Sequence, residues 1–340
     1  MTRQTSKSKP VLEIENLCTV FHAEDGAWPA INGLSLTLQA GEVLGLVGES
    51  GSGKSVAGFS VMGLIDHPGE IVSGSVRLKG RDLREMSEEE LRRIRGSEMA
   101  MIFQDPLTTL NPVLTIGEQM AETIFEHRSD ISKATINDRC VELLRKVGIT
   151  SPAARLEQYP HELSGGMRQR IAIAIALLNN PDLIIADEPT TALDVTIQGQ
   201  IIAEMQALQA ESGTALIWIT HDLAVVSELA DRVAVMYAGD IVEQGTTDEI
   251  LDDPRHPYTI GLLASVPGDA IPGEPLHQIS GMAPSLAARP AGCSFHPRCE
   301  RASDLCREKD PAPTSDGNGR MWRCHHPVQA SPATDGEAER

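Results

Sequence analysis

Aromatic side chains are scarce in this sequence. Phe, Trp and Tyr together make up 3% of the 340 residues, although hydrophobic residues as a whole make up 41%. That total is normal for a globular protein. The core must therefore be mostly aliphatic, and few rings are available to stack on a flat ligand.

Positive charge is scarce as well. The chain carries 29 Lys and Arg against 48 Asp and Glu, a formal net charge of −19 at pH 7. Proteins that bind nucleic acid usually present a basic face, so we expect no nucleic-acid partner. Phosphate binding is not excluded, because a loop of backbone N–H groups with one lysine can hold an anion locally.

Long apolar runs are also missing. The longest is IAIAIALL (171–178), about half of the roughly 18 residues that a membrane span needs. The N-terminal segment MTRQTSKSKP is polar and has no apolar signal core. We therefore expect a cytosolic protein, whose role at a membrane would come through a partner.

Short apolar segments typical of buried strands alternate with helical patterns. These segments are VLGLV (43–47), MAMIF (99–103), DLIIA (182–186) and TALIWIT (214–220). Such alternation indicates an α/β fold with a largely parallel sheet. Residues 11–47 alternate like a small antiparallel sheet, and residues 113–158 follow a helical pattern. After about residue 254 the composition shifts to Pro, Gly and Cys, which predicts two domains, 1–254 and 255–340.

The segment GESGSGKS (48–55) directly follows the first of these strands. Gly48, then four residues, then Gly53-Lys54-Ser55 is the spacing of a phosphate-binding loop. The glycines let backbone N–H groups point inward, Lys54 reaches the terminal phosphates, and the Ser55 hydroxyl ligates Mg²⁺. The alternative interpretation is an ordinary Gly/Ser turn.

Each of the other buried strands is followed by a polar residue suited to phosphate chemistry. In open α/β sheets, ligands bind beyond the carboxyl ends of the strands. Asp187 suits an Mg²⁺ partner, and Glu188 suits orienting or deprotonating the attacking water. Gln104 can touch both metal and water, and His221 can donate to the γ-phosphate. For Glu188 the alternative is a solvated loop carboxylate.

The motif LSGGMRQR (163–170), together with IIADEPTTALD (184–194), closely resembles the nucleotide-binding subunits of ATP-binding cassette (ABC) transporters. The resemblance covers about residues 11–250 and implies a P-loop NTPase core with an antiparallel β subdomain and a helical subdomain at about 106–160. The implied nucleotide-binding residues are Gly48, Glu49, Ser50, Gly51, Ser52, Gly53, Lys54, Ser55, Val56, Gln104 and Asp187, the signature residues Ser164, Gly165, Gly166 and Met167, and Asp194 of the D-loop 192–194. Glu188, His221 and Gln104 are the implied catalytic residues. Where this signature has SGGM, the commonest form is SGGQ.

The family stacks the adenine ring on an aromatic residue of the first sheet. By register from Asn16, Phe21 matches that position best, and Trp28 is the second candidate.

The signature has a physical basis of its own. Gly165 and Gly166 allow a close backbone approach, and Ser164 can cap the helix that follows, which creates a second anion site. In the family, two cassettes pair head to tail, and the signature of one closes on the nucleotide of the other. The resemblance therefore implies a second ATPase subunit.

The C-terminal sequence narrows the resemblance. RHPYTIGLLASVPG (255–268), IPGEPLHQISGMAPSL (271–286) and GCSFHPRC (292–299) look like the C-terminal extension of the oligopeptide/dipeptide/nickel permease ATPases. This implies an ATPase on the cytoplasmic face of the membrane, two transmembrane permease subunits, an extracytoplasmic binding protein and a heterodimer of ATPases. The solute is not identified. The alternatives are a soluble ABC ATPase of translation or DNA repair, which usually has two cassettes in one chain, and a non-hydrolysing cassette.

Four of the six cysteines are clustered near the C-terminus. Cys293, Cys299, Cys306 and Cys324 are separated by 5, 6 and 17 residues. In a cytosolic chain such clustering favours a metal site over disulfides. The C-x₂₋₄-C pairs of a four-cysteine zinc site are absent, although a zinc site could use His296, His325 or His326 instead. Similar permease tails are associated with a [4Fe–4S] cluster, which we prefer over zinc; free thiols are the remaining alternative.

Overall fold

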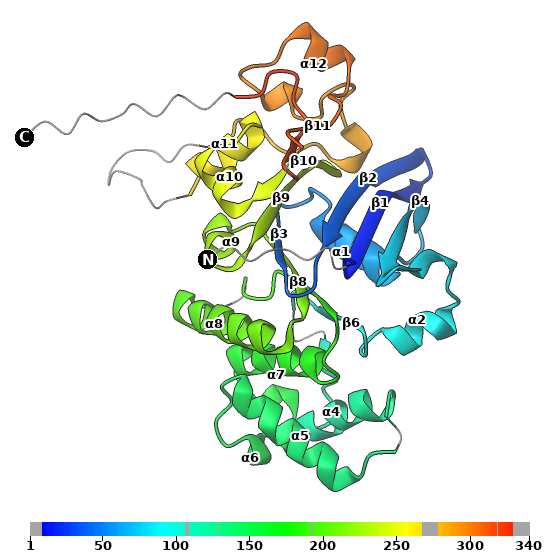
Figure 1. Cartoon of the computed structure of the whole chain (residues 1–340), viewed down its shortest axis with the longest axis vertical. Coiled ribbons are helices and arrows are strands. Elements are labelled where there is room, and N and C mark those ends of the chain that lie inside the picture. The colour runs from blue at the N-terminus through cyan, green and yellow to red at the C-terminus, as the bar shows by residue number, and fades with distance from the viewer. Residues whose placement is uncertain are drawn as a thin grey trace, which may run out of the picture.

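The computed structural model describes residues 9–105, 109–128, 130–191, 193–266, 278–317 and 319–328. Figure 1 shows an elongated molecule with a central sheet, a group of helices at one end and the C-terminal segments at the other end. A second, antiparallel sheet lies beside the central one. No helix in the described part of the chain is long and apolar enough to cross a membrane.

The central sheet has eight strands in the order β11-β12-β10-β9-β3-β8-β7-β6. They are β3 (Val43–Val47), β6 (Met99–Ile102), β7 (Leu183–Asp187), β8 (Ala215–Thr220), β9 (Arg232–Tyr237), β10 (Asp240–Thr246), β11 (Thr314–Ser315) and β12 (Met321–Trp322). The five strands from β9 to β6 are parallel, and the others join antiparallel. The four apolar segments of the sequence therefore form neighbouring parallel strands, as expected.

The antiparallel sheet has the order β2-β1-β4-β5. Its strands are β1 (Leu12–Ala23), β2 (Gly26–Leu38), β4 (Gly69–Leu78) and β5 (Arg81–Asp82). One cluster of buried aliphatic side chains joins this sheet, helix α1 (Lys54–Met62) and the central sheet. This shared core fixes the loop before α1 between the two sheets.

The helical pattern predicted for residues 113–158 is confirmed. It forms α4 (Ile116–Phe125), α5 (Lys133–Lys146) and α6 (Pro152–Leu156), at the far end of the molecule in Figure 1. Ile136, Cys140 and Leu144 are the buried face of α5. Helix α7 (Gly165–Leu177) joins these helices to the central sheet through a second aliphatic cluster. The subdomain bounds 106–160 remain a prediction, and residues 106–108 and 129 lie outside the described part.

The remaining helices of the described part are α2 (Glu88–Ile94), α8 (Val195–Ser212), α9 (Leu223–Leu229), α10 (Thr247–Asp252), α11 (Pro257–Ala264), α12 (Asp304–Glu308) and the short 3₁₀ turns η1 (Leu83–Glu85), η2 (Pro160–Glu162), η4 (Leu286–Ala288) and η5 (His296–Arg298). Among them, α9 packs against the inner strands β3 and β8 of the central sheet. The boundary proposed at residue 254 falls between α10 and α11. Strand β12 nevertheless pairs with β10, so the C-terminal residues extend the central sheet.

Candidate functional site: a phosphate loop with four strand-end residues

The loop 48–55 runs from the end of β3 into α1, and its shape demands glycine. Gly53 has φ 104° at the cap of α1. A Cβ at Gly53 would lie 2.6 Å from the Ala30 carbonyl oxygen, and a Cβ at Gly48 would lie 2.2 Å from that of Met236. Only glycine avoids both the left-handed strain and the close contacts. The backbone of the loop is therefore held tightly against the sheet.

Lys54 lies inside this loop. Its Nζ donates hydrogen bonds to the carbonyl oxygens of Gly48 at 2.7 Å and Glu49 at 3.0 Å. Burial lowers the pKa of Lys54, and the carboxylates of Glu188, Asp187 and Glu49 oppose that shift. Lys54 and the N–H groups of the loop are suited to bind an anion. The carboxylates around Lys54 are suited to a divalent metal that such an anion carries.

Asp187 ends β7 beneath the loop and is 3% exposed. Its carboxylate accepts a hydrogen bond of 3.0 Å from the Ser55 hydroxyl. Burial raises the pKa of Asp187, whereas this hydrogen bond lowers it. A hydroxyl beside a carboxylate is a suitable oxygen pair for Mg²⁺. The structure thus brings together two of the three residues that the sequence assigned to the metal, while the third, Gln104, hydrogen-bonds to Glu188.

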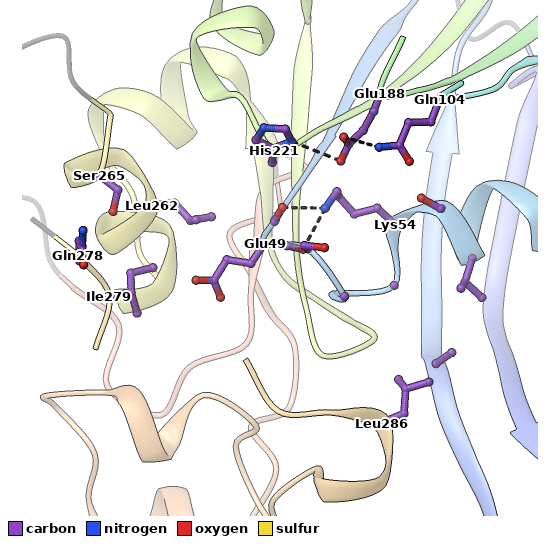
Figure 2. Close-up of a pocket in the computed structure, with 17 residues that line it drawn as sticks. Glu49, Lys54, Gln104, Glu188, His221, Leu262, Ser265, Gln278, Ile279 and Leu286 are labelled. Carbon is purple, nitrogen blue, oxygen red and sulfur yellow. Dashed lines mark hydrogen bonds and ion pairs between the residues drawn. The ribbon is translucent and has the colours of Figure 1, made fainter. Parts of the chain in front are cut away.

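Glu188 is the meeting point of three strand ends. Its carboxylate accepts hydrogen bonds from Gln104 Nε2 at 3.2 Å and Thr191 Oγ1 at 3.0 Å. His221 Nδ1 lies 3.3 Å from the other carboxylate oxygen. Figure 2 shows the side chains of Gln104, Glu188 and His221 facing the same space as Lys54. Residues spread over more than a hundred positions are therefore assembled at one edge of the sheet, as the strand ends predicted.

A cavity of about 870 Å³ lies in front of the loop. Its walls include residues of the loop together with Gln104, Glu188 and His221. The remaining wall was not anticipated from the sequence, and consists of Ala30, Leu262, Ser265, Gln278, Ile279 and Leu286. Ser52, predicted as a nucleotide contact, is 1% exposed and does not line the cavity. The C-terminal segments thus form part of this site.

The two aromatic candidates for adenine lie opposite each other in the first hairpin. Phe21 of β1 pairs with Trp28 of β2. Neither is among the residues that line the cavity. The structure therefore does not distinguish between them, and the adenine contact remains a prediction.

The signature residues lie apart from the phosphate loop of their own chain. Ser164 caps α7 by accepting a hydrogen bond of 3.4 Å from the Met167 N–H. A Cβ on Gly165 would meet nothing within 4 Å. None of the four signature residues lines the cavity. Asp194 caps α8 in the same way, through the Ile197 N–H at 3.0 Å, and Ala192 lies outside the described residues.

The six cysteines are free thiols. Cys293, Cys299, Cys306 and Cys324 line one small cavity together with His256, His296, His325 and His326. Burial raises the pKa of Cys293 and of Cys324 to about 11. In the described part of the chain, however, no group of three or more His, Cys, Asp or Glu side chains is placed to hold a metal ion. Among the described residues the structure therefore contains no preformed site for the expected iron–sulfur cluster.

Two family descriptions match the chain. Residues 31–191 match the family described as ABC transporter. Residues 242–306 match the oligopeptide/dipeptide transporter C-terminal region. The first match includes the phosphate loop, the signature and the pair Asp187-Glu188, and the second includes α11 and three of the four clustered cysteines.

Curated relatives match over nearly the whole chain. The dipeptide transport ATP-binding protein DppD of Escherichia coli (strain K12) is 48% identical over 318 residues, covering 94% of this chain and 97% of that protein. The oligopeptide transport ATP-binding protein AppD of Bacillus subtilis (strain 168) is 48% identical over 317 residues, covering 92% and 96%.

Solved structures match the cassette portion. The ATP-binding cassette MJ0796, in a dimeric post-hydrolysis state bound to ADP and Pi, has a TM-score of 0.63 at 28% identity; the match covers 69% of this chain and 98% of that one. The cbiO1 protein of Clostridium perfringens, part of the transporter complex cbiONQ, has a TM-score of 0.61 at 26% identity, with coverages of 72% and 92%. With the fold, the phosphate loop and the relatives in agreement, the chain belongs to the ABC transporter family and is an ATPase of the group that carries the oligopeptide/dipeptide C-terminal region.

Proposed function

We propose that this chain binds and hydrolyses ATP to power the import of peptides or related small solutes. The observation that carries the proposal is the meeting of Lys54, Glu188 and His221 around one cavity. The solute class is supported by the relatives, which are dipeptide and oligopeptide transport ATP-binding proteins. No observation favours an ATPase of translation or DNA repair.

Within this proposal, the loop holds the triphosphate through its N–H groups and Lys54. Ser55, Asp187 and Gln104 would hold Mg²⁺, which offsets the charge that develops on the phosphates during transfer. Glu188 orients the attacking water and accepts its proton. His221 shares a hydrogen bond with Glu188, so it can respond to the γ-phosphate and fix the carboxylate.

The proposed partners rest on the incomplete site and on the transport proteins that the chain resembles. Because the signature lies away from the loop of its own chain, a second cassette must supply the signature that closes on this nucleotide. We infer that this second cassette is a different chain, and that two permease subunits and an extracytoplasmic binding protein complete the importer. The complex would hold this chain at the cytoplasmic face of the membrane.

A four-thiolate site in the tail remains a separate proposal, with [4Fe–4S] preferred over zinc. Its support is that the four thiols line a single cavity, which supplies the donor set of such a cluster. Because no ligand group stands ready among the described residues, the thiols must draw together on binding. Anaerobic purification with iron and zinc analysis tests it: about four irons or one zinc per chain supports a site, and neither metal refutes it.

Transport in sealed vesicles tests the main proposal. The assembled importer, with its binding protein, should accumulate a labelled dipeptide or oligopeptide only when ATP is present on the side of this chain. The matched control is the same complex with Glu188→Gln, which should bind ATP and accumulate nothing. Peptide-independent hydrolysis without uptake of any peptide in a mixed library would refute peptide import.

A further inference from the structure

Glu49, the second residue of the phosphate loop, is held by three different groups. Its N–H donates a hydrogen bond of 2.8 Å to the Tyr258 hydroxyl. Its carbonyl oxygen accepts one of 3.0 Å from Lys54 Nζ. Its carboxylate accepts two from the terminal nitrogens of Arg298, at 2.6 and 2.9 Å. Tyr258 and Arg298 come from residues 255–328, which we call the C-terminal extension.

Arg298 is also held in place by contacts other than the Glu49 carboxylate. Its side chain is only 5% exposed, and its Nε donates to the Ser280 carbonyl oxygen at 2.8 Å. The guanidinium lies 5.8 Å from the ring centre of Tyr237 and 6.0 Å from that of Phe295. These rings pack in turn against Tyr258, with centres 4.6 and 5.4 Å from it. A buried, stacked arginine that binds both carboxylate oxygens is rigid and permanently charged.

The ion pair between Arg298 and Glu49 lies where its charge balance can affect phosphate binding. Glu49 lines the cavity and acts electrostatically on Lys54. Figure 2 shows its side chain beside the loop, facing the wall that α11 and Ile279 form. An unpaired carboxylate here would repel the phosphate charges that the loop receives, since like charges at short range in a partly buried site are weakly screened. Arg298, which is 249 residues away in the sequence but in direct contact with Glu49, neutralises this charge.

We propose that Arg298 is a positioning residue for ATP, which neutralises and fixes the Glu49 carboxylate so that the phosphate loop accepts the triphosphate. The C-terminal extension is then part of the nucleotide site as well as a neighbour of it. The proposal rests on the assignment of residues 48–55 as the phosphate loop.

Binding of Mg²⁺ and ATP to the purified full-length chain, measured by titration calorimetry, tests this role. Arg298→Gln should weaken ATP binding about tenfold, because it leaves a bare carboxylate at the loop. Glu49→Gln should act in the opposite direction and tighten binding, because it leaves a cation there. Arg298→Lys keeps the charge without the two-pronged contact and should keep most of the affinity. The deficit of Arg298→Gln should shrink as salt is raised.

A purely mechanical clamp gives a different pattern. If Glu49→Gln and Arg298→Gln weaken binding equally, or if Arg298→Lys is as weak as Arg298→Gln, the charge role is wrong. Wild-type affinity in Arg298→Gln would refute any role. Should that variant fail to fold, Glu49→Gln and Arg298→Lys still decide the sign. Lys54→Ala separates the two proposals, since unchanged ATP binding there would refute the phosphate-loop assignment itself.

Discussion

The phosphate loop and the signature segment make opposite use of the chain around them. The loop is enclosed: Lys54, Asp187 and Glu188 each have partners within the same chain, and the C-terminal extension closes one side. The signature is open at Gly165, where a Cβ would meet nothing within 4 Å, whereas a Cβ at Gly166 would lie 3.2 Å from Ile197. In the proposed pairing of cassettes, one chain therefore prepares a nucleotide site, and its signature would complete the site of another chain.

The largest expected effect comes from replacing Glu188, the proposed proton acceptor beside the enclosed phosphate loop. Glu188→Gln keeps the size and most hydrogen bonds of the side chain but cannot take a proton. ATP hydrolysis by the assembled complex should fall on the order of 10²-fold or more, while ATP binding is retained. Steady-state phosphate release and nucleotide binding measure the two quantities. Hydrolysis at the wild-type rate would remove Glu188 from this role.

A side chain added at Gly165 tests whether the signature acts separately from the phosphate loop. Gly165→Val places its Cβ where this chain has nothing within 4 Å, so folding and ATP binding by the isolated chain should be preserved. In the assembled complex, the valine methyl groups should block the close approach to the partner's nucleotide. We expect hydrolysis to fall roughly 100-fold, an effect of about 3 kcal/mol on the transition state. Equal damage to the isolated chain's ATP binding would show that the signature and the phosphate loop are not separate.

Removing the cation of the loop should act on affinity instead. Lys54→Ala deletes a charged hydrogen-bond donor and should weaken ATP binding roughly 10- to 100-fold, already in the isolated chain. Calorimetric titration with Mg²⁺ and ATP measures this change. An unaltered dissociation constant would count against the phosphate-loop interpretation.

The smallest expected effect concerns the adenine ring. Phe21→Ala should weaken ATP binding about tenfold by removing a stacking surface. Trp28→Ala is the matched control in the paired strand and should have a smaller effect on binding. Comparison of ATP with inorganic triphosphate identifies the cause, because triphosphate has no base to stack. A larger loss in Trp28→Ala would exchange the two roles.

The phosphate loop and the residues around it could be predicted from the sequence largely because they follow buried strands. Gln104, Asp187 and His221 come directly after apolar segments, with Glu188 next to Asp187, and parallel strands end at one edge of a sheet. The glycine spacing of the loop is local and carries its own meaning. These relations need no knowledge of long-range packing.

The wall contributed by the C-terminal extension could not be predicted in this way. Arg298 lies 249 residues from Glu49 in the sequence, and no spacing rule connects them. Leu262 and Ile279 look like ordinary apolar residues of a tail. Their position depends on β12 pairing with β10 and on the ring packing around Tyr258. Such contacts are decided by the whole fold.

The central claim is that the chain binds ATP by itself and hydrolyses it rapidly only with a second cassette. The most direct test is single-turnover hydrolysis of bound ATP, compared between the isolated chain and the assembled complex at equal occupancy of this site. We predict slow hydrolysis by the isolated chain and a rise on the order of 10²-fold on assembly, absent when the partner cassette carries a blocked signature. Hydrolysis by the isolated, monomeric chain at the rate of the complex would contradict the claim.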